Sequence, residues 1–305
     1  MLRHTVLVFL FIACSLPVLA GEFQPLYPNA PVRDAFRNMG PERVRIEEQS
    51  PASHSRNRRI FSQVSEPVYK TIPAEKAANT GVAVVLFPGG GFVDVWLDKE
   101  GTDIAWWLSK HGIASMIVKY STSSNADGKE TMSFATYQEI VRQDTARAMV
   151  VMREHSRQLG VDPDKIGMMG FSAGAVAVQW HLFHKKEDGG CCTVDMITRP
   201  AFAALIYGGG YGDKQTNPPL ALLDDPGNLP PVYMAAARDD EYVDFDGYYY
   251  FRLFYDLIEK VPNSELHIYG KGGHGFALDK KGHSVSTWLD TFYLWLQDLG
   301  MFTAS

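Results

Sequence analysis

The sequence predicts a three-layer α/β/α fold, in which a mostly parallel central sheet carries helices on both faces. Two observations predict this fold class. Short apolar runs alternate with longer amphipathic segments along most of the chain, as strands alternate with helices in βαβ units. The apolar runs are also nearly continuous, whereas strands with one face in water alternate apolar and polar residues. The strands are therefore expected to be covered on both faces.

The predicted elements follow one another in a regular order. Predicted strands lie at residues 68–72, 82–87, 114–120, 165–169, 202–207, 232–237 and 265–269. Predicted helices lie at residues 102–111, 135–159, 173–183, 246–259 and 285–299. Residues 21–64 lack clear periodicity, so we expect an arm that wraps the surface of a single domain at residues 65–305. Sites in such sheets form where strands end, so the loops after the strands are the ones to search.

The composition indicates one large globular domain without a nucleic-acid-binding surface. The 305 residues are 46% hydrophobic and carry a formal net charge of −6. Nucleic-acid-binding proteins concentrate Lys and Arg on one face, and the basic cluster at residues 56–59 is short and lies in a polar stretch. We expect a solvated loop there. Cys191 and Cys192 are adjacent and can pair only through a strained ring, so we expect no disulfide framework.

The first twenty residues have the features of an export signal. A short cationic start is followed by an apolar core at residues 5–13 and by a small-residue cleavage site at residues 18–20. We expect cleavage after Ala20 and a secreted or periplasmic protein with no integral membrane segment. A membrane anchor would need a longer apolar span. Lipidation at Cys14 stays an alternative, although the apolar residues after it are unusual at a lipidated start.

The most informative motif is Gly170-Phe171-Ser172-Ala173-Gly174, which lies between a predicted strand and a predicted helix. A G-x-S-x-G sequence at such a junction is typical of a nucleophile elbow, a tight turn that exposes the serine Oγ. The flanking small residues let the strand and the helix approach closely. The same pattern also occurs in ordinary turns. Ser172 is therefore a candidate nucleophile whose partners must lie on other loops.

Two glycine-rich segments follow strands and compete for one role. Residues 88–92 read Pro-Gly-Gly-Gly-Phe and precede the serine, whereas residues 207–211 read Tyr-Gly-Gly-Gly-Tyr and follow it. In the elbow arrangement an oxyanion is bound by the N–H after the nucleophile and by an N–H from an early loop. We therefore expect an oxyanion hole formed by Ala173 with Gly90 or Gly91, and a pocket-lining turn at the later segment. A flexible turn or a phosphate-binding loop is the alternative for residues 88–92, but phosphate-binding loops normally add Gly-Lys-Ser/Thr or a later acidic contact to a ribose, and neither spacing appears here.

Carboxylates follow the predicted strand at residues 232–237, where the elbow arrangement places the acid of a catalytic triad. Asp239 and Asp240 are both candidates. Val243 follows Asp240 by three residues, as in the usual Asp-x-x-Val placement, so we expect Asp240 to be the acid and keep Asp239 as the alternative. A solvated acidic turn is a further alternative. A calcium site is another, although the run lacks the spacing of a known calcium loop.

A histidine stands on the glycine-rich segment after the last predicted strand, at residues 270–276. His274 comes after both Ser172 and the acidic residues in the chain, as the elbow arrangement requires. We expect its Nε2 to take the proton of Ser172, while the carboxylate holds Nδ1–H. Isolated histidines are more often packing residues, but this one lies on a loop that the fold class had already singled out.

A second group of histidines and cysteines raises the question of a metal. His181 and His184 form an H-x-x-H pair on a predicted helix, with Cys191 and Cys192 further along. Structural zinc sites need well-spaced pairs of ligands, and catalytic ones a third ligand and a water. We therefore expect these histidines to pack on the helix face, and we expect no metal and no other cofactor.

Taken in order, the motifs at residues 88–92, 170–174, 239–240 and 272–276 resemble those of secreted α/β-hydrolases of the acetylxylan esterase type. The resemblance covers approximately residues 64–299. It implies an α/β-hydrolase fold and a serine esterase that removes O-acetyl or other short acyl groups from polysaccharides such as xylan. It also implies roles for Ser172, Asp240 and His274 as a catalytic triad. Further matching segments are Lys99-Glu100-Gly101, Trp106-Trp107-Leu108, residues 143–148 and residues 160–166, whereas Ala175 departs from the glycine of many relatives.

Substrate contacts and competing functions stay open at this point. The expected partner is an acylated carbohydrate or a small ester. Aromatic side chains near the predicted mouth could stack on a sugar ring, or could be buried in the core: Phe92, Trp96, Tyr211 and Tyr242. A general short-chain carboxylesterase, a serine peptidase and a catalytically silent glycan-binding relative are the alternative functions. A peptidase usually needs an extra specificity domain, and a binder needs no complete set of serine, acid, base and oxyanion loop.

Overall fold

The structure is a computed structural model of the chain. It describes residues 22–47, 54–55, 57–123, 129, 131–183, 197–208, 229–242, 255, 257–279 and 282–302. The predicted export signal lies outside these residues. So does most of the predicted helix at 246–259, of which residues 255 and 257–259 are described and are helical.

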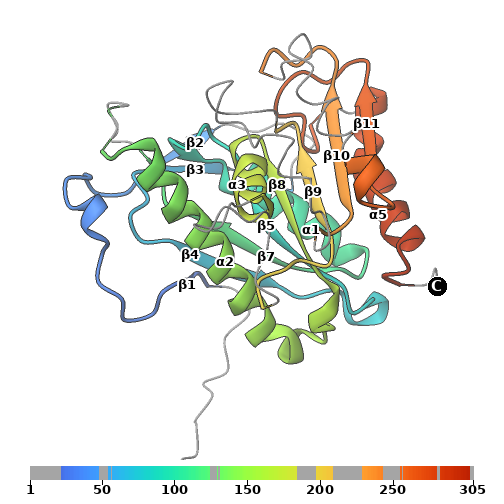
Figure 1. Ribbon diagram of the computed structural model, residues 1–305, viewed down its shortest axis with the longest axis horizontal. Helices are drawn as coiled ribbons and strands as arrows, with labels where there is room; N and C mark the ends of the chain where they lie inside the picture. Colours follow the sequence, from blue (N-terminus) through green and yellow to red (C-terminus); the bar gives the residue numbers. More distant parts are fainter. Residues whose placement is uncertain are drawn as a thin grey trace, which may run out of the picture.

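An eight-stranded sheet forms the centre of the molecule (Figure 1). Its strand order is β1-β4-β7-β5-β8-β9-β10-β11, with parallel pairing from β7 to β11 and antiparallel pairing of β1 and β4 at one edge. All seven predicted strands are present. The strands are β1 (Gln24–Pro25), β4 (Val68–Ile72), β5 (Ala83–Phe87), β7 (Ala114–Lys119), β8 (Ile166–Phe171), β9 (Ala203–Ile206), β10 (Val232–Ala237) and β11 (Glu265–Tyr269).

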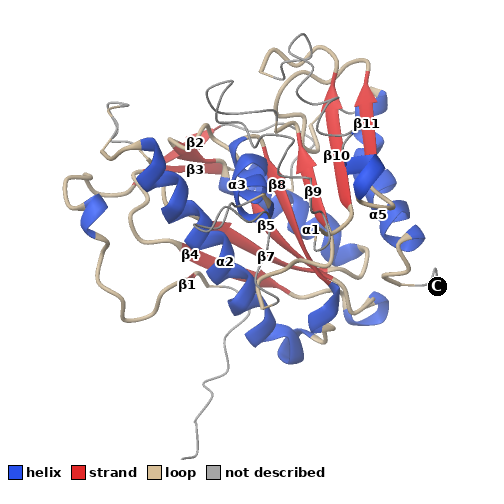
Figure 2. Ribbon diagram, viewed as in Figure 1, coloured by secondary structure: helices blue, strands red, loops and turns tan. Residues whose placement is uncertain are grey.

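Helices cover both faces of this sheet (Figure 2). One hydrophobic core contains α2 (Phe134–Leu159) and α3 (Ala173–Leu182), and a second contains α1 (Asp103–Lys110) and α5 (Trp288–Asp298). The central strand β5 contributes alternate residues to the two cores and is buried along its whole length. The predicted three-layer α/β/α fold is therefore confirmed. Within the described ranges, none of the helices combines the length and apolarity needed to cross a membrane.

Helix α2 shows how local sequence fixes an element. Its N-cap is Ser133, whose Oγ accepts a hydrogen bond from the Thr136 N–H at 3.2 Å. Its C-cap is Gly160, which has a left-handed backbone with φ 66°. Between these caps the helix buries one apolar face against the sheet and α3.

The arm before residue 64 contains more regular structure than expected. β2 (Arg43–Glu47), β3 (Arg58–Ser62) and β6 (Asp94–Val95) form a second, antiparallel sheet, and β1 joins the main sheet. The expected solvated loop at residues 56–59 is therefore wrong for Arg58 and Arg59, because both lie on β3 and Arg58 is only 3% exposed. Short strands that pair with distant segments leave little periodicity in the sequence. The division of the chain at residue 64 stays a prediction.

Candidate active site

Ser172 lies at a sharp turn between β8 and α3. Its backbone has φ 50° and ψ −120°, a conformation that non-glycine residues rarely adopt. Glycine is required on both sides of the turn: a Cβ on Gly170 would lie 2.3 Å from the Gly174 carbonyl oxygen, and one on Gly174 would lie 2.0 Å from the Phe87 carbonyl oxygen. The turn has the geometry of a nucleophile elbow.

Ser172, His274 and Asp240 form one hydrogen-bonded chain. Ser172 Oγ lies 2.8 Å from His274 Nε2, and His274 Nδ1 lies 2.9 and 3.0 Å from the two carboxylate oxygens of Asp240. The three residues lie on loops that follow β8, β11 and β10, so the parallel sheet brings them to one edge. The Asp240 side chain is fully buried, whereas the His274 side chain is 24% exposed. With Nδ1–H donated to the carboxylate, Nε2 can accept the proton of the serine hydroxyl.

Asp239, the alternative acid, makes different contacts. Its Oδ1 accepts hydrogen bonds from the N–H groups of Gly272 at 2.8 Å and Gly273 at 2.7 Å. These backbone hydrogen bonds, with that of Gly273 as the largest cause, lower the pKa of the Asp239 carboxyl. Asp239 therefore holds the start of the loop that carries His274, and Asp240 contacts the imidazole itself.

The loop at residues 88–92 presents two backbone N–H groups, those of Gly90 and Gly91, that meet no acceptor among the described residues, whereas the Gly89 N–H donates to Glu100. The Gly89 carbonyl accepts from the Trp96 N–H at 3.0 Å, and the Gly90 carbonyl accepts from the Asp94 N–H at 2.9 Å. The C=O and N–H of one trans peptide point in opposite directions, so the N–H groups of Gly90 and Gly91 face away from these contacts. In the described part of the chain neither N–H, nor that of Ala173, donates to a protein acceptor. Donors of this kind can stabilise an oxyanion.

Gly90 needs to be glycine for this turn to form. Its backbone has φ 133°, which residues with a side chain rarely adopt, and a Cβ there would lie 2.2 Å from the Asp94 carbonyl oxygen. Gly90 and Gly91 border the same cavity as Ser172 and His274. The structure thus brings together the predicted oxyanion loop, the serine and the histidine.

The cavity over Ser172 and His274 has a volume of about 560 Å³. Two of the four aromatic residues predicted near the mouth line it, Trp96 and Tyr242. Tyr242 is 62% exposed, and its ring centroid lies 4.8 Å from that of His274. Cationic groups lie over the Trp96 ring, with Lys99 Nζ at 5.4 Å and Arg45 Cζ at 5.8 Å from its centroid.

The prediction that Phe92 contacts a substrate needs correction. Its ring is buried and stacks on Trp180 with 4.7 Å between centroids, and it meets Tyr137 edge-on at 5.4 Å. Phe92 has φ 64°, and its side chain packs into the core beneath the glycine loop instead of lining the cavity. Tyr211, the remaining aromatic candidate, lies outside the described residues.

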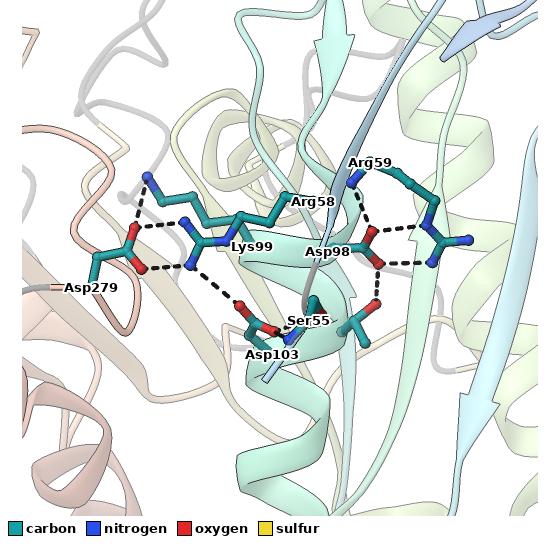
Figure 3. Close-up of polar contacts among 8 residues, drawn as sticks. Ser55, Arg58, Arg59, Asp98, Lys99, Asp103 and Asp279 are labelled. Atoms are coloured by element: carbon teal, nitrogen blue, oxygen red, sulfur yellow. Dashed lines mark hydrogen bonds and ion pairs between the residues drawn. The ribbon is translucent and has the colours of Figure 1, made fainter. Parts of the chain in front are cut away.

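Charged residues beside the site were not predicted. Figure 3 shows the Arg58 guanidinium bound to both carboxylate oxygens of Asp279, at 2.9 and 2.5 Å, and to Asp103 at 3.3 Å. Lys99 Nζ, which borders the cavity, lies 3.4 Å from Asp279. Burial acts to raise the pKa of Asp279, but the hydrogen bond from Arg58 and the charge of Lys99 outweigh it and lower the pKa. The arm thus contacts the loop that carries His274.

A second ion pair joins the arm to the same part of the domain. Arg59 donates from Nε and from a terminal nitrogen to the two oxygens of Asp98, at 2.8 and 2.7 Å (Figure 3). Asp98 is the first residue of the π-helical turn η3 (Asp98–Thr102), which also contains Lys99 and Glu100. The only sequence signal for this turn was its place in the family resemblance, because its partners lie on segments far away in the chain.

Of the histidines and cysteines considered as metal ligands, only His181 lies among the described residues, and its contacts are those of a packing residue. His181 is buried, with Nε2 3.0 Å from the Thr198 carbonyl oxygen and Nδ1 3.3 Å from Thr145 Oγ1. His184, Cys191 and Cys192 lie outside the described residues. Across the residues that the structure does describe, no three or more His, Cys, Asp or Glu side chains gather in a way that could hold a metal ion.

Comparisons with known proteins connect this site to other chains. No protein-family model matches the sequence. The chain is 26% identical over 246 residues to an acetylxylan esterase from Xylanibacter ruminicola. That match covers 72% of this chain and 45% of the relative, so the chain spans less than half the length of the curated protein it matches.

Solved structures align over most of the chain. An acetyl ester-xyloside bifunctional hydrolase from Caldicellulosiruptor lactoaceticus has a TM-score of 0.63 at 20% identity, covering 93% of this chain and 98% of that chain. An α/β-hydrolase from a Medee basin deep-sea metagenome library has a TM-score of 0.59 at 17% identity, covering 84% and 98%. A thermophilic esterase from Thermogutta terrifontis has a TM-score of 0.58 at 17% identity, covering 86% and 96%. The chain therefore has the α/β-hydrolase fold, and its sequence is similar to that of an acetylxylan esterase.

Proposed function

We propose that this protein is a serine esterase that removes O-acetyl or other short acyl groups from polysaccharides such as xylan. The observation that carries the proposal is the hydrogen-bonded chain from Ser172 through His274 to Asp240, which opens into a cavity. Hydroxyl, imidazole and carboxylate in this order can act as nucleophile, base and orienting acid. Similarity to an acetylxylan esterase supports the reaction class.

In the first half of the proposed reaction, Ser172 Oγ attacks the ester carbonyl carbon while His274 Nε2 takes the hydroxyl proton. The carbonyl oxygen becomes an oxyanion, which Gly90, Gly91 and Ala173 can bind through their free N–H groups. Asp240 stabilises the imidazolium that forms. Collapse of the tetrahedral intermediate then breaks the bond to the alcohol oxygen, and His274 returns its proton to that leaving group.

In the second half, water hydrolyses the acyl-enzyme. His274 takes a proton from the water, the resulting hydroxide attacks the acyl carbon, and a second oxyanion occupies the same N–H groups. The intermediate releases the carboxylic acid, and the proton returns to Ser172 Oγ. The proposed cycle needs no metal or cofactor.

The cavity and its rim support an acylated carbohydrate as substrate. Trp96 and Tyr242 present aromatic surface at the cavity, and a flat apolar face of a sugar can stack on such rings. The exposed Tyr242 places one ring directly beside the imidazole. We also propose that the protein is exported, because residues 1–20 have a cationic start, an apolar core and a small-residue cleavage site.

The deciding experiment is acetate release from acetylated xylan by the purified protein. We expect acetate from the polymer, and faster turnover of an aryl acetate than of an aryl butyrate or a feruloyl ester. Ser172→Ala is the control and should lower turnover of every ester by several orders of magnitude without changing the circular dichroism spectrum.

Two outcomes would change the proposal. Turnover of the aryl esters without acetate from xylan would favour a general short-chain carboxylesterase. Equal turnover by the wild type and Ser172→Ala would remove the serine from the mechanism.

A further inference from the structure

Glu100 is a buried carboxyl that the proposed mechanism does not use. It lies on the π-helical turn η3, between Lys99 and Gly101, and is 4% exposed. It also borders the cavity that holds Ser172 and His274. Burying a carboxyl is costly unless donors satisfy it, and turns of this type occur often at functional sites. The contacts of Glu100 therefore indicate what it does.

The first contact holds the glycine loop. Glu100 Oε2 accepts a hydrogen bond from the Gly89 N–H at 2.5 Å. The carbonyl of the same peptide unit, that of Pro88, accepts from the Tyr120 hydroxyl at 2.8 Å on the opposite side. The peptide before Gly89 is thus fixed from both sides. The next two peptides carry the free N–H groups of Gly90 and Gly91, so their direction depends on this anchor.

The second contact reaches the histidine. The Tyr207 hydroxyl donates to Glu100 Oε1 at 2.8 Å. The ring of Tyr207 packs edge-on against the imidazole of His274, with 5.2 Å between centroids, and against Phe276 at 4.5 Å. One carboxyl therefore connects the glycine loop to the ring on which the imidazole rests.

We propose that Glu100 is a positioning residue that fixes the oxyanion loop through Gly89 and the imidazole of His274 through Tyr207. This inference rests on the proposed function, because it assigns Glu100 a part in that reaction. Glu100 takes no proton and touches no reacting atom. Its two carboxyl oxygens receive one donor each, one from the glycine loop and one from the tyrosine whose ring packs against His274.

Geometry and charge can be separated with two conservative variants. Glu100→Gln keeps the length of the side chain, so its amide oxygen can accept from Gly89 and its amide nitrogen can donate to the Tyr207 hydroxyl oxygen. Glu100→Asp keeps the charge but is one methylene shorter, so it cannot reach both donors. We expect Glu100→Asp to lower kcat for an aryl acetate by roughly 10- to 100-fold, with KM changed by less than about 3-fold, because oxyanion contacts act mainly in the transition state. We expect Glu100→Gln to stay within about 3-fold of wild-type kcat.

Asp98→Asn is the matched control. Asp98 lies on the same turn and is equally buried, but its partner is Arg59 on the arm. This variant should lower the thermal midpoint of unfolding and leave kcat within about 3-fold of wild type. If Glu100→Asp behaves like this control, Glu100 is a merely structural residue and the inference is wrong. A loss of kcat in Glu100→Gln as large as in Glu100→Asp would also contradict it, because charge would then be decisive.

Hydrogen–deuterium exchange gives a measurement that does not depend on activity. We expect faster exchange in the peptide that contains residues 88–93 in Glu100→Asp than in the wild type and Glu100→Gln. Unchanged exchange there would overturn the inference. If the wild type hydrolyses no ester, the proposed function fails, and the exchange measurement still decides whether Glu100 holds the loop.

Discussion

The central sheet and the N-terminal arm are held in place by different interactions. Every residue of β5 and β8 is buried, and their apolar side chains pack against helices on both faces. The arm pairs with the domain through β1 and β3, and its Glu42 binds Lys119, but most of its described ion pairs join an arginine of the arm to an aspartate of the domain. These pairs are Arg33 with Asp144, Arg45 with Asp94, Arg58 with Asp103 and Asp279, and Arg59 with Asp98.

This difference indicates that the strand-end loops and the arm contribute differently to the site. Apolar burial is large and non-directional, so it fixes where strands end and thereby where Ser172, Asp240 and His274 meet. A buried ion pair depends on both partners being present. Among the described residues, Arg58 of the arm pairs with Asp279, which also binds Lys99 at the cavity, and Arg45 lies over the ring of Trp96. We therefore expect changes in the strand-end loops to affect the chemical step and changes in the arm to affect mainly stability.

Among these variants, replacement of Asp240 on the loop after β10 should lower kcat the most. Asp240→Asn should lower kcat by about 10⁴-fold without changing the unfolding midpoint, because an amide can stabilise the wrong tautomer of His274. Asp239→Asn is the matched comparison. Its amide oxygen can still accept from Gly272 and Gly273, so kcat should fall by less than about 10-fold. A larger loss in Asp239→Asn, from steady-state kinetics of both variants, would transfer the acid role to Asp239.

A smaller effect, on stability, is expected in the arm. Arg58→Met should lower the free energy of unfolding by about 3–5 kcal/mol, because Asp103 and Asp279 would lose a buried partner. Denaturant titration measures this change, and kcat should fall much less than in Asp240→Asn. Arg37→Ala removes an exposed pair with Asp34 and should cost about 0–1 kcal/mol. An equally small effect of Arg58→Met would show that ion pairs do not hold the arm.

The strands, and the meeting of Ser172, Asp240 and His274 at one edge of the sheet, were predictable because their signals are local. Continuous apolar runs mark strands that are buried on both faces, and parallel strands end at a shared edge where loops converge. Between the two adjacent candidates, the Asp-x-x-Val spacing favoured Asp240, and the structure shows which of the two carboxylates contacts the imidazole. Adjacent residues in a turn present their side chains in different directions, and only Asp240 faces the imidazole.

The arm and the buried residues around the site were less predictable because their contacts join distant segments. Arg58 lies 221 positions from Asp279, and Glu100 lies 107 positions from Tyr207. The sequence could not place Phe92, because an aromatic residue beside the glycine loop can face either the cavity or the core. Here it packs against Trp180 in the core.

Covalent labelling of the folded wild-type protein with an alkyl fluorophosphonate, followed by peptide mass spectrometry, tests directly whether Ser172 is the nucleophile. We expect one phosphonyl group per chain on the peptide that contains Ser172, and none in Ser172→Ala, because only a serine activated by His274 displaces the fluoride readily. Failure of the folded wild type to react, or a phosphonyl group on a different residue, would contradict the assignment of Ser172 as the nucleophile.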